Sequence, residues 1–233
     1  LAAGGLRYTQ FYSTARCWPT RGALLTGYYA QQIGRDGLSR LGLRGNRQRP
    51  TWAPLLPALL KSAGYRSYHC GKWHIDGTPE AGGFDRSYLV EDHDRHLGVQ
   101  NRSQDGRRLP PEVPDGGYYT SHAIAERAIE FLRQHKRDHS EKPFFQYLAF
   151  VAPHFPLHAP QEDIDRYRGR YSLGWDAIRQ QRWERMQQVF SLPGQLSALE
   201  PEIGPPYDFP KAIAELGPGE VNRELSWSSL NDT

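Results

Sequence analysis

Hydrophobic positions along the chain recur in segments that predict alternating strands and helices. Residues 6 to 13 are rich in aromatic side chains and favour a short strand. Residues 21 to 33 carry apolar side chains at three- and four-residue spacing, which predicts a helix. A second helix is predicted over residues 53 to 64, with Gly64 as its C-terminal stop, and it leads into a strand over residues 65 to 71.

Farther along, residues 76 to 117 hold many Gly, Pro and Asp residues and predict a long polar excursion. A helix is predicted over residues 121 to 134. Its apolar stripe consists of Ile124, Ala128, Phe131 and Leu132. Residues 143 to 151 form the most apolar run of the chain, which suits a strand covered on both faces. The last predicted element is a helix over residues 175 to 190.

The order strand, helix, helix, strand, helix, strand predicts an α/β fold with a mainly parallel, mixed sheet flanked by helices. Each predicted strand runs into residues that can carry chemistry, and ligands of open α/β sheets bind at the carboxyl ends of the strands. We therefore expect one site that gathers Cys17, Arg21, Lys72, His74 and His154.

Composition narrows the possible functions. The 233 residues are 38% hydrophobic and 12% aromatic, which is ordinary for a globular protein. A net charge of +3 with scattered arginines argues against a nucleic-acid partner. No apolar run reaches membrane-span length, so no membrane partner is expected. The two cysteines, Cys17 and Cys70, do not form a disulfide framework.

The candidate site residues have complementary chemistry. A proline two residues later places Cys17 at or just before a helix N-terminus, where an anion is favoured, and Arg21 can reach back to the same point. Lys72 and His74 point to one face if the extended geometry persists, and His154 lies in a stiff turn between prolines. The set supplies a nucleophile position, two cations for an oxyanion and two imidazoles for proton transfer.

Three segments carry a family resemblance. "CWPTRGALLTG", "AGYRSYHCGKWH" and "KPFFQYLAFVAPHFPLHAP" resemble three signatures of the type I sulfatases, in the family order and within residues 6 to 160. The resemblance implies an alkaline-phosphatase-like fold, in which residues 1 to 233 are part of a single sulfatase catalytic domain that lacks both ends. An incomplete sheet and an inactive isolated fragment are then expected.

The resemblance also implies an activity, the hydrolysis of aryl or carbohydrate sulfate esters with release of inorganic sulfate. A formylglycine-generating enzyme would oxidise Cys17 to Cα-formylglycine, which is hydrated at rest. One hydroxyl of the diol would attack the sulfur, and the second would allow the bound sulfate to be expelled. A serine would trap the sulfated enzyme, because it has no second hydroxyl.

By the same resemblance, Arg21 would orient the formylglycine and Lys72 would hold sulfate oxygens. His74 would act as the base for sulfate release, and His154 would protonate the leaving oxygen. A divalent cation, Ca²⁺ or else Mg²⁺, would polarise the sulfate. Cys17, once converted, is the only position that matches a metal ligand of the family.

The chain departs from the family pattern at several points. Trp18 stands where Ser or Thr is commoner in the family. The two aspartates and the later Asp-Asn pair that bind the metal in the family have no match in this chain. The cluster "EDHD" at residues 91 to 94 contains ligand types, but a solvated loop is the better interpretation.

Two alternatives remain. One is a phosphodiesterase or phosphonate monoester hydrolase built on the same site, and the other is an inactive truncated fragment, which should bind calcium weakly. The expected partners are a sulfated small molecule or carbohydrate and the formylglycine-generating enzyme. The protein is expected to be periplasmic or secreted in a bacterium.

Overall fold

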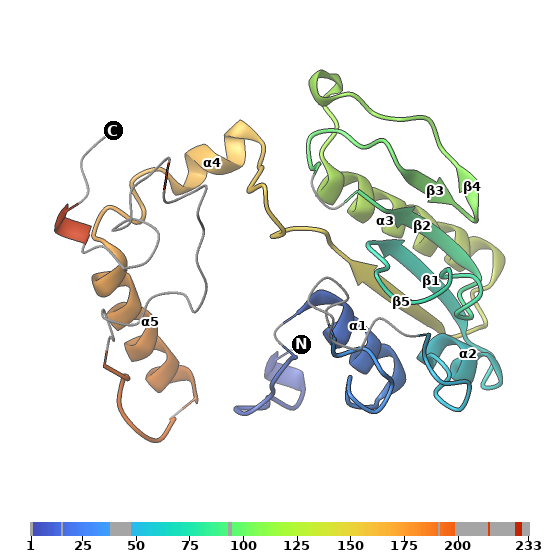
Figure 1. Ribbon diagram of the computed structural model, residues 1–233, viewed down its shortest axis with the longest axis horizontal. Helices are drawn as coiled ribbons and strands as arrows, with labels where there is room; N and C mark the ends of the chain where they lie inside the picture. Colours follow the sequence, from blue (N-terminus) through green and yellow to red (C-terminus); the bar gives the residue numbers. More distant parts are fainter. Residues whose placement is uncertain are drawn as a thin grey trace. The chain divides into compact units, whose positions relative to one another are not determined.

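The computed structural model describes residues 2–14, 16–37, 48–92, 95–190, 192–198, 214 and 227–229. The chain forms two compact units (Figure 1). Residues Tyr12–Gln161 make up one, called here the sheet unit, which holds all five candidate site residues. The other, called the helical unit, consists of Leu1–Phe11 and Glu162–Thr233. The single catalytic domain over residues 1 to 233 stays a prediction.

A mixed sheet forms the centre of the sheet unit. Among the described residues it has five strands in the order β4-β3-β2-β1-β5. Strand β1 runs parallel to both β2 and β5, whereas β3 and β4 are antiparallel additions. The predicted α/β class with a mainly parallel, mixed sheet is therefore confirmed. The strands are β1 (Arg66–Gly71), β2 (Arg86–Val90), β3 (Arg102–Gln104), β4 (Arg107–Arg108) and β5 (Phe144–Ala149).

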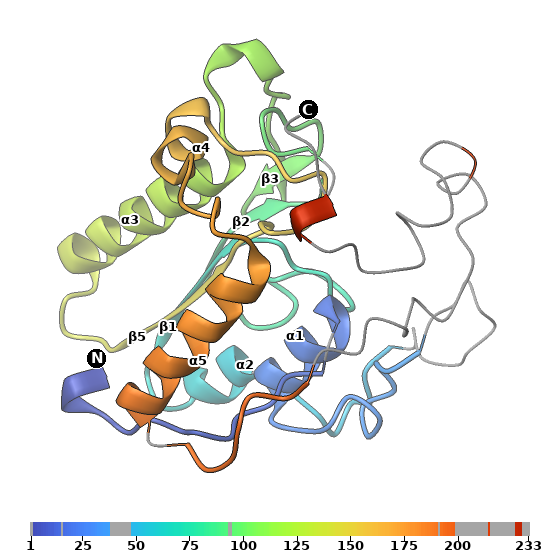
Figure 2. The same ribbon diagram turned by 90° about the vertical axis from the view of Figure 1, so that its left-hand side faces the viewer.

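Helices cover the two faces of this sheet (Figures 1 and 2). Helix α3 lies over one face, and α1 and α2 lie on the other. The helical unit has its own helices and short 3₁₀ turns, and α4 begins at the boundary between the units. The sheet-unit helices are α1 (Cys17–Thr26), α2 (Leu56–Lys61), η3 (Pro114–Gly116) and α3 (Thr120–Asp138). The others are η1 (Ala2–Gly4), α4 (Gln161–Tyr167), α5 (Trp175–Phe190) and η4 (Trp227–Ser229).

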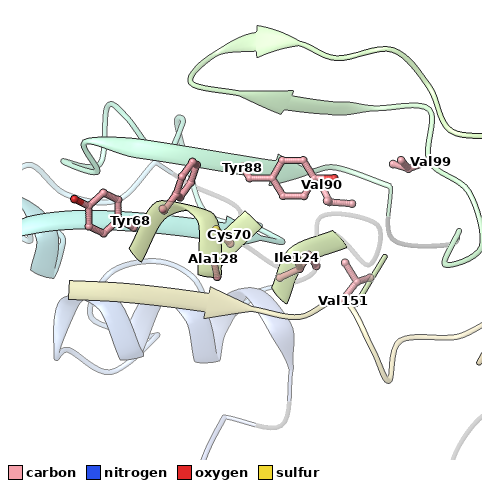
Figure 3. Packing of buried hydrophobic residues seen from close by; sticks show 9 residues of the cluster. Tyr68, Cys70, Tyr88, Val90, Val99, Ile124, Ala128 and Val151 are labelled. Atoms are coloured by element: carbon pink, nitrogen blue, oxygen red, sulfur yellow. The ribbon is translucent and has the colours of Figure 1, made fainter. Parts of the chain in front are cut away.

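The core is divided by the sheet, because successive strand residues point to opposite faces. Tyr68 and Cys70 of β1 face α3, where they join a buried cluster with Ile124 and Ala128 (Figure 3). A second cluster on the α1 side includes Leu25, Leu55, Trp73, Phe84 and Tyr147. This second cluster lies beneath the candidate site and fixes the elements that carry it.

Inside the helical unit, aromatic contacts hold α5. Trp175 meets Trp227 edge to face with ring centroids 5.2 Å apart, and the Arg7 guanidinium lies 5.6 Å from the Phe190 ring. The predicted helix over residues 175 to 190 is confirmed at both ends.

Three sequence predictions hold for the core of the sheet unit, and a fourth, the buried stripe of α3, is partly wrong. The strand over residues 65 to 71 and the helix over residues 121 to 134 are confirmed, and the helix extends to Asp138. Gly64 has a left-handed backbone (φ 81°), as expected of a stop, but the helix is shorter than the predicted 53 to 64 and spans only Leu56–Lys61. In the buried stripe of α3, Leu132 is only half-buried, and His135 completes the stripe instead.

Other predictions were wrong. Residues 6 to 13 form no strand, and their large side chains stay exposed, because the described chain offers them no strand to pair with. The predicted excursion over residues 76 to 117 contains β2, β3 and β4. The helix predicted over residues 21 to 33 ends at Thr26, since Gly27 turns the backbone left-handed (φ 76°).

The strand over residues 143 to 151 exists, but it is not covered on both faces. Phe144 is 49% exposed and Leu148 is 43% exposed, because β5 is the edge strand of the described sheet. None of the helices that the structure describes is both long and apolar enough to cross a bilayer.

Candidate active site

Cys17 is the first residue of α1, at the end of the helix where backbone N–H groups point outwards. Arg16 before it is extended (φ −139°, ψ 156°), and its side chain does not cap the helix. These N–H groups and the positive end of the helix dipole favour an anion here. Cys17 is a partly buried free thiol, and Cys70 is a buried free thiol.

Arg21 ties α1 to the carboxyl ends of two neighbouring strands. Its Nη1 donates to the Lys72 carbonyl at 2.8 Å and to the Tyr147 hydroxyl at 3.4 Å. Its Nη2 donates to the Phe150 carbonyl at 3.2 Å, just after β5. The guanidinium therefore fixes the position of the helix N-terminus relative to β1 and β5, and it brings a permanent positive charge to this edge of the sheet.

Lys72 follows β1 directly and is only 1% exposed. Burial lowers the pKa of Lys72, a negative charge at Cys17 would raise it, and Arg21 lowers it further. The lysine therefore lies within electrostatic range of both Cys17 and Arg21. An anion bound at this point would stabilise the buried ammonium, so the three residues form one positively charged site at a helix N-terminus.

His74 packs against Trp18, the residue that follows Cys17. Its ring meets Trp18 edge to face at 5.3 Å, and Arg35 donates to its carbonyl at 3.4 Å. The extended geometry expected between Lys72 and His74 does not persist, because β1 ends at Gly71 and His74 has a left-handed backbone (φ 55°). The histidine still reaches the site, since the turn folds it against the first turn of α1.

His154 lies on the loop after β5. Its backbone N–H donates to the Val151 carbonyl at 3.1 Å, and its Nδ1 donates to the Phe155 carbonyl at 2.7 Å. In addition, His96 donates from Nε2 to the His154 carbonyl at 2.8 Å. Since a carbonyl only accepts, the Phe155 contact places the proton of a neutral His154 ring on Nδ1.

The structure thus joins Cys17, Arg21, Lys72 and His74 through contacts and charge, and it places His154 on the loop that follows the Phe150 carbonyl. Sequence reasoning missed Tyr147 and His96 as supports of this site. Tyr147 lies in the apolar run of β5, where an isolated hydroxyl was the one available signal. His96 carried no signal, because it lies in the segment predicted to be a polar excursion.

A metal site is not built by the described residues alone, because no group of three or more His, Cys, Asp or Glu side chains lies together among them. Asp92 of the "EDHD" cluster is 6% exposed and accepts hydrogen bonds from the backbone of Gln100 and Asn101. Burial alone would raise its pKa, but these bonds lower it. Asp92 is therefore a buried structural carboxylate rather than part of a solvated loop, and residues 93 and 94 lie outside the described residues.

His69 lies beneath the site and is fully buried among the rings of Trp73, Phe84 and Tyr147. Burial lowers the pKa of His69 from 6.5 to about 4. The hydrogen bond to the Lys72 carbonyl opposes this shift, and the positive charge of Arg21 adds to it. The ring is therefore neutral in the folded protein well below the pH at which the unfolded chain takes up a proton.

This burial predicts a loss of stability in acid. Between pH 6.5 and about 4, the unfolded chain binds a proton at residue 69 and the folded chain does not, so the free energy of unfolding falls with falling pH. The full difference is about 3 kcal/mol. Denaturant unfolding at pH 7 and pH 4 should show a smaller acid loss for His69→Leu than for the parent protein. The exposed His122→Leu is the control, and equal acid losses in parent and His69→Leu would contradict the prediction.

Comparison with known proteins connects the chain to one family. A family model described as Sulfatase matches residues 1–198. The arylsulfatase of Klebsiella aerogenes is 32% identical over 207 residues, which are 80% of this chain and 43% of that protein. The human N-acetylgalactosamine-6-sulfatase is 30% identical over 214 residues, which are 77% of this chain and 38% of that protein.

A solved structure has a similar fold. The crystal structure of Ps i-CgsB in complex with k-i-k-neocarrahexaose has a TM-score of 0.51 and 27% identity, over 65% of this chain and 38% of that one. This chain spans about two fifths of the length of the curated relatives it matches. Because the family match covers most of the chain, including all five candidate site residues, the chain belongs to the sulfatase family.

Proposed function

We propose that the protein carrying this chain hydrolyses sulfate esters and releases inorganic sulfate. The observation that carries the proposal is Cys17 at a helix N-terminus, in electrostatic range of a buried lysine and an arginine. Such a site binds an anion and stabilises charge that develops on it. Cys17 is proposed to be converted to Cα-formylglycine by a formylglycine-generating enzyme, because the cysteine, Pro19 and Arg21 have the family spacing.

Each residue has a task in this proposal. The formylglycine would supply a hydrated aldehyde whose oxygen attacks the sulfur. Lys72 binds a sulfate oxygen, and Arg21 holds the helix N-terminus against β1 and β5. His74, packed on Trp18, accepts the proton whose loss releases sulfate. His154 donates a proton to the departing oxygen from Nε2, which requires the imidazolium form because the neutral ring keeps its proton on Nδ1.

The family also implies a divalent cation, for which we propose Ca²⁺ or Mg²⁺. When bound, it would neutralise part of the sulfate charge. The described residues fit such an ion only at Cys17, because no cluster of acidic and histidine ligands lies among them. The steps above are therefore assigned to the side chains of this chain and not to the metal.

A parallel assay separates this function from its alternative. Purified protein is given an aryl sulfate, a sulfated monosaccharide and an aryl phosphonate at equal concentration, with calcium present. A sulfatase releases sulfate from the first two at higher kcat/KM than it cleaves the phosphonate. Faster cleavage of the phosphonate would assign the site to a phosphonate monoester hydrolase or phosphodiesterase.

Lys72→Met is expected to lower kcat/KM for an aryl sulfate by about 10²- to 10³-fold, because a preorganised positive charge at the sulfate is lost. Thermal stability should be kept or raised, since an apolar chain of similar length replaces a buried ammonium. Kinetics and thermal unfolding measured together test this. Lys61→Met, on the exposed side of α2, is the matched control. A loss below threefold would remove Lys72 from sulfate binding.

Tyr147→Phe is expected to lower kcat/KM about fivefold, because Arg21 loses one of its three acceptors and a net hydrogen bond contributes about 1 kcal/mol. Tyr68→Phe is the control, since its hydroxyl bonds His135 on the α3 side of the sheet and should not affect turnover. Equal losses in the two variants would show that Tyr147 acts only through stability.

The proposed substrates are sulfated carbohydrates or aryl sulfates. Two relatives support this class by name, an arylsulfatase and an N-acetylgalactosamine-6-sulfatase. The periplasmic or secreted location stays a prediction, which fractionation of producing cells would test.

A further inference from the structure

The turn after β1, residues 72 to 77, carries two of the candidate site residues and lies outside helix and strand. Gly71 before it has a φ of 116°, and a Cβ at this position would lie 2.1 Å from the Ala149 carbonyl oxygen, so the chain passes close to β5 before it turns. Three residues later, His74 has a left-handed backbone (φ 55°). A residue other than glycine keeps such a conformation only where surrounding contacts hold it. The contacts of this turn therefore decide where the His74 ring lies.

Two arginines hold backbone carbonyl groups of this turn. Arg21 donates to the Lys72 carbonyl at 2.8 Å, and Arg35 donates from Nη2 to the His74 carbonyl at 3.4 Å. Arg21 already has a place in the proposed chemistry, whereas Arg35 has none. Yet the carbonyl that Arg35 holds belongs to the residue with the strained backbone, so this contact bears directly on the conformation of His74.

Arg35 is a rigid support. It is 5% exposed, and its backbone N–H donates to the Ala30 carbonyl at 2.8 Å. Its methylene stem packs on α1 at Gly22, where an added Cβ would lie 3.5 Å from Arg35 Cγ and 3.0 Å from Ile33 Cδ1. The guanidinium therefore projects from a fixed base, and its hydrogen bond fixes the His74 carbonyl relative to α1.

Other charges surround the Arg35 guanidinium. Asp76, two residues after His74, forms an ion pair of 3.6 Å with Arg49, and both side chains are mostly buried. Burial lowers the pKa of Arg35, the Asp76 carboxylate opposes this shift, and the positive charge of Arg49 adds to it. Arg35 and Asp76 thus lie within electrostatic range of each other, so charge as well as a hydrogen bond connects Arg35 to the turn.

The His74 ring contacts the first turn of α1, where it meets Trp18 edge to face with centroids 5.3 Å apart. The ring is thus held by Trp18 and the backbone by Arg35. Without a donor at its carbonyl, the His74 backbone can relax out of the left-handed region. Because Cβ moves with the backbone, the ring would then leave its place on Trp18.

We propose that Arg35 is a positioning residue for His74 and thereby controls the release of sulfate from the enzyme. The inference rests on the proposed function, in which His74 takes a proton from the second hydroxyl of the formylglycine diol. As that proton leaves, the aldehyde C=O re-forms and the C–O bond to sulfate breaks, with its electron pair going to the sulfate oxygen. Arg35 acts on this step through the His74 backbone. Misplacing a catalytic group by about 1 Å can cost about 10²-fold in rate.

Arg35→Met, in the whole protein that carries this chain, tests the step at which Arg35 acts. For a two-step reaction, kcat/KM reports the attack that releases the alcohol, whereas kcat also contains the release of sulfate. With 4-nitrophenyl sulfate, whose good leaving group favours fast attack, we expect kcat to fall about 10- to 100-fold. The KM should fall in parallel, so that kcat/KM stays within about threefold of the parent. A burst of 4-nitrophenol should precede the slow steady state.

Arg35→Lys is the second variant. It keeps the positive charge that faces Asp76 and the stem that packs on α1, so it should fold as the parent does. Because the ammonium cannot reproduce the geometry of the guanidinium, kcat should fall about threefold to tenfold with kcat/KM again unchanged.

Arg66→Met is the matched control. Arg66 also forms an ion pair, with Asp85 at 3.5 Å, but at the opposite end of β1 from the site. This variant should keep kcat and KM within about twofold of the parent. If kcat/KM falls as far as kcat in Arg35→Met, the proposal is overturned, because a general loosening of the site slows attack as well as release. An unchanged kcat in both Arg35 variants would also overturn it.

A measurement without substrate separates this inference from the proposed function. The Hδ2 and Hε1 signals of His74 are followed by NMR in parent, Arg35→Met and Arg66→Met protein. The Trp18 ring should shift these signals in the parent, and Arg35→Met alone should move them towards the positions of an exposed histidine. That result would support the role of Arg35 even if no sulfate ester is hydrolysed, in which case the proposed function alone fails. Sulfatase activity in a parent whose His74 signals and kcat do not respond to Arg35→Met would overturn this inference and leave the proposed function standing.

Discussion

Replacing Cys17 by serine is expected to convert the protein from a catalyst into a reagent that releases one equivalent of alcohol and then stops. A serine at the helix N-terminus can attack the sulfur beside Lys72 and Arg21, but it has no second hydroxyl with which to expel the sulfate. Steady-state turnover should fall by at least about 10⁴-fold. A burst of alcohol followed by a sulfated peptide in the mass spectrum would show this.

Cys70→Ala is the matched control, because this thiol is buried on the α3 side of the sheet and burial raises its pKa to about 12. It should leave turnover within about twofold of the parent. Sustained turnover by the Cys17→Ser variant, beyond the first equivalent, would show that release of sulfate does not need a diol at residue 17.

The second large effect is expected for His154→Ala. If His154 protonates the departing oxygen, its loss matters most where the leaving group is a poor one, such as a sugar alcohol. General acid catalysis is typically worth about 10²- to 10⁴-fold, and the loss for a nitrophenyl sulfate should be much smaller. The measurement is kcat/KM over a series of sulfate esters with leaving groups of increasing pKa, for parent and variant.

His122→Ala on the exposed side of α3 controls for loss of an imidazole as such. The slope of log kcat/KM against leaving-group pKa should become steeper only in the His154 variant. Equal losses across the series would remove His154 from proton donation and leave it a structural residue of the turn that His96 and Phe155 hold.

The parts of the fold that could be predicted from sequence are those in which apolar residues form a clear pattern along the chain. Strand β1, strand β5 and helix α3 each carry an apolar pattern that packing against a neighbour requires, and each was found. Strands β3 and β4 could not be predicted, because "RSQ" and "RR" have no apolar pattern and form only through pairing with β2. Residues 6 to 13 show the reverse case, in which strand-favouring residues have no described partner.

For the site, the rule that ligands bind at the carboxyl ends of parallel strands placed Lys72 and His154 after β1 and β5. The same rule placed Cys17 and Arg21 after a strand over residues 6 to 13 that the structure does not have, and α1 reaches this edge of the sheet through the hydrogen bonds of Arg21 instead. The rule could not give the left-handed backbone of His74, which depends on how the turn after β1 packs on Trp18. Nor could it give Tyr147 as an acceptor for Arg21, since that contact depends on which face of β5 lies towards α1. Such contacts are set by tertiary packing, which a single sequence does not display.

The central claim is that Cys17 becomes the nucleophile of a sulfate ester hydrolase. Mass spectrometry of the peptide that contains Cys17, from protein co-expressed with a formylglycine-generating enzyme, tests it most directly. The account predicts an aldehyde in place of the thiol at residue 17, with Cys70 unchanged in the same sample and sulfate release that rises with the converted fraction. A thiol alone at residue 17 under those conditions, in protein that still releases sulfate, would contradict the account.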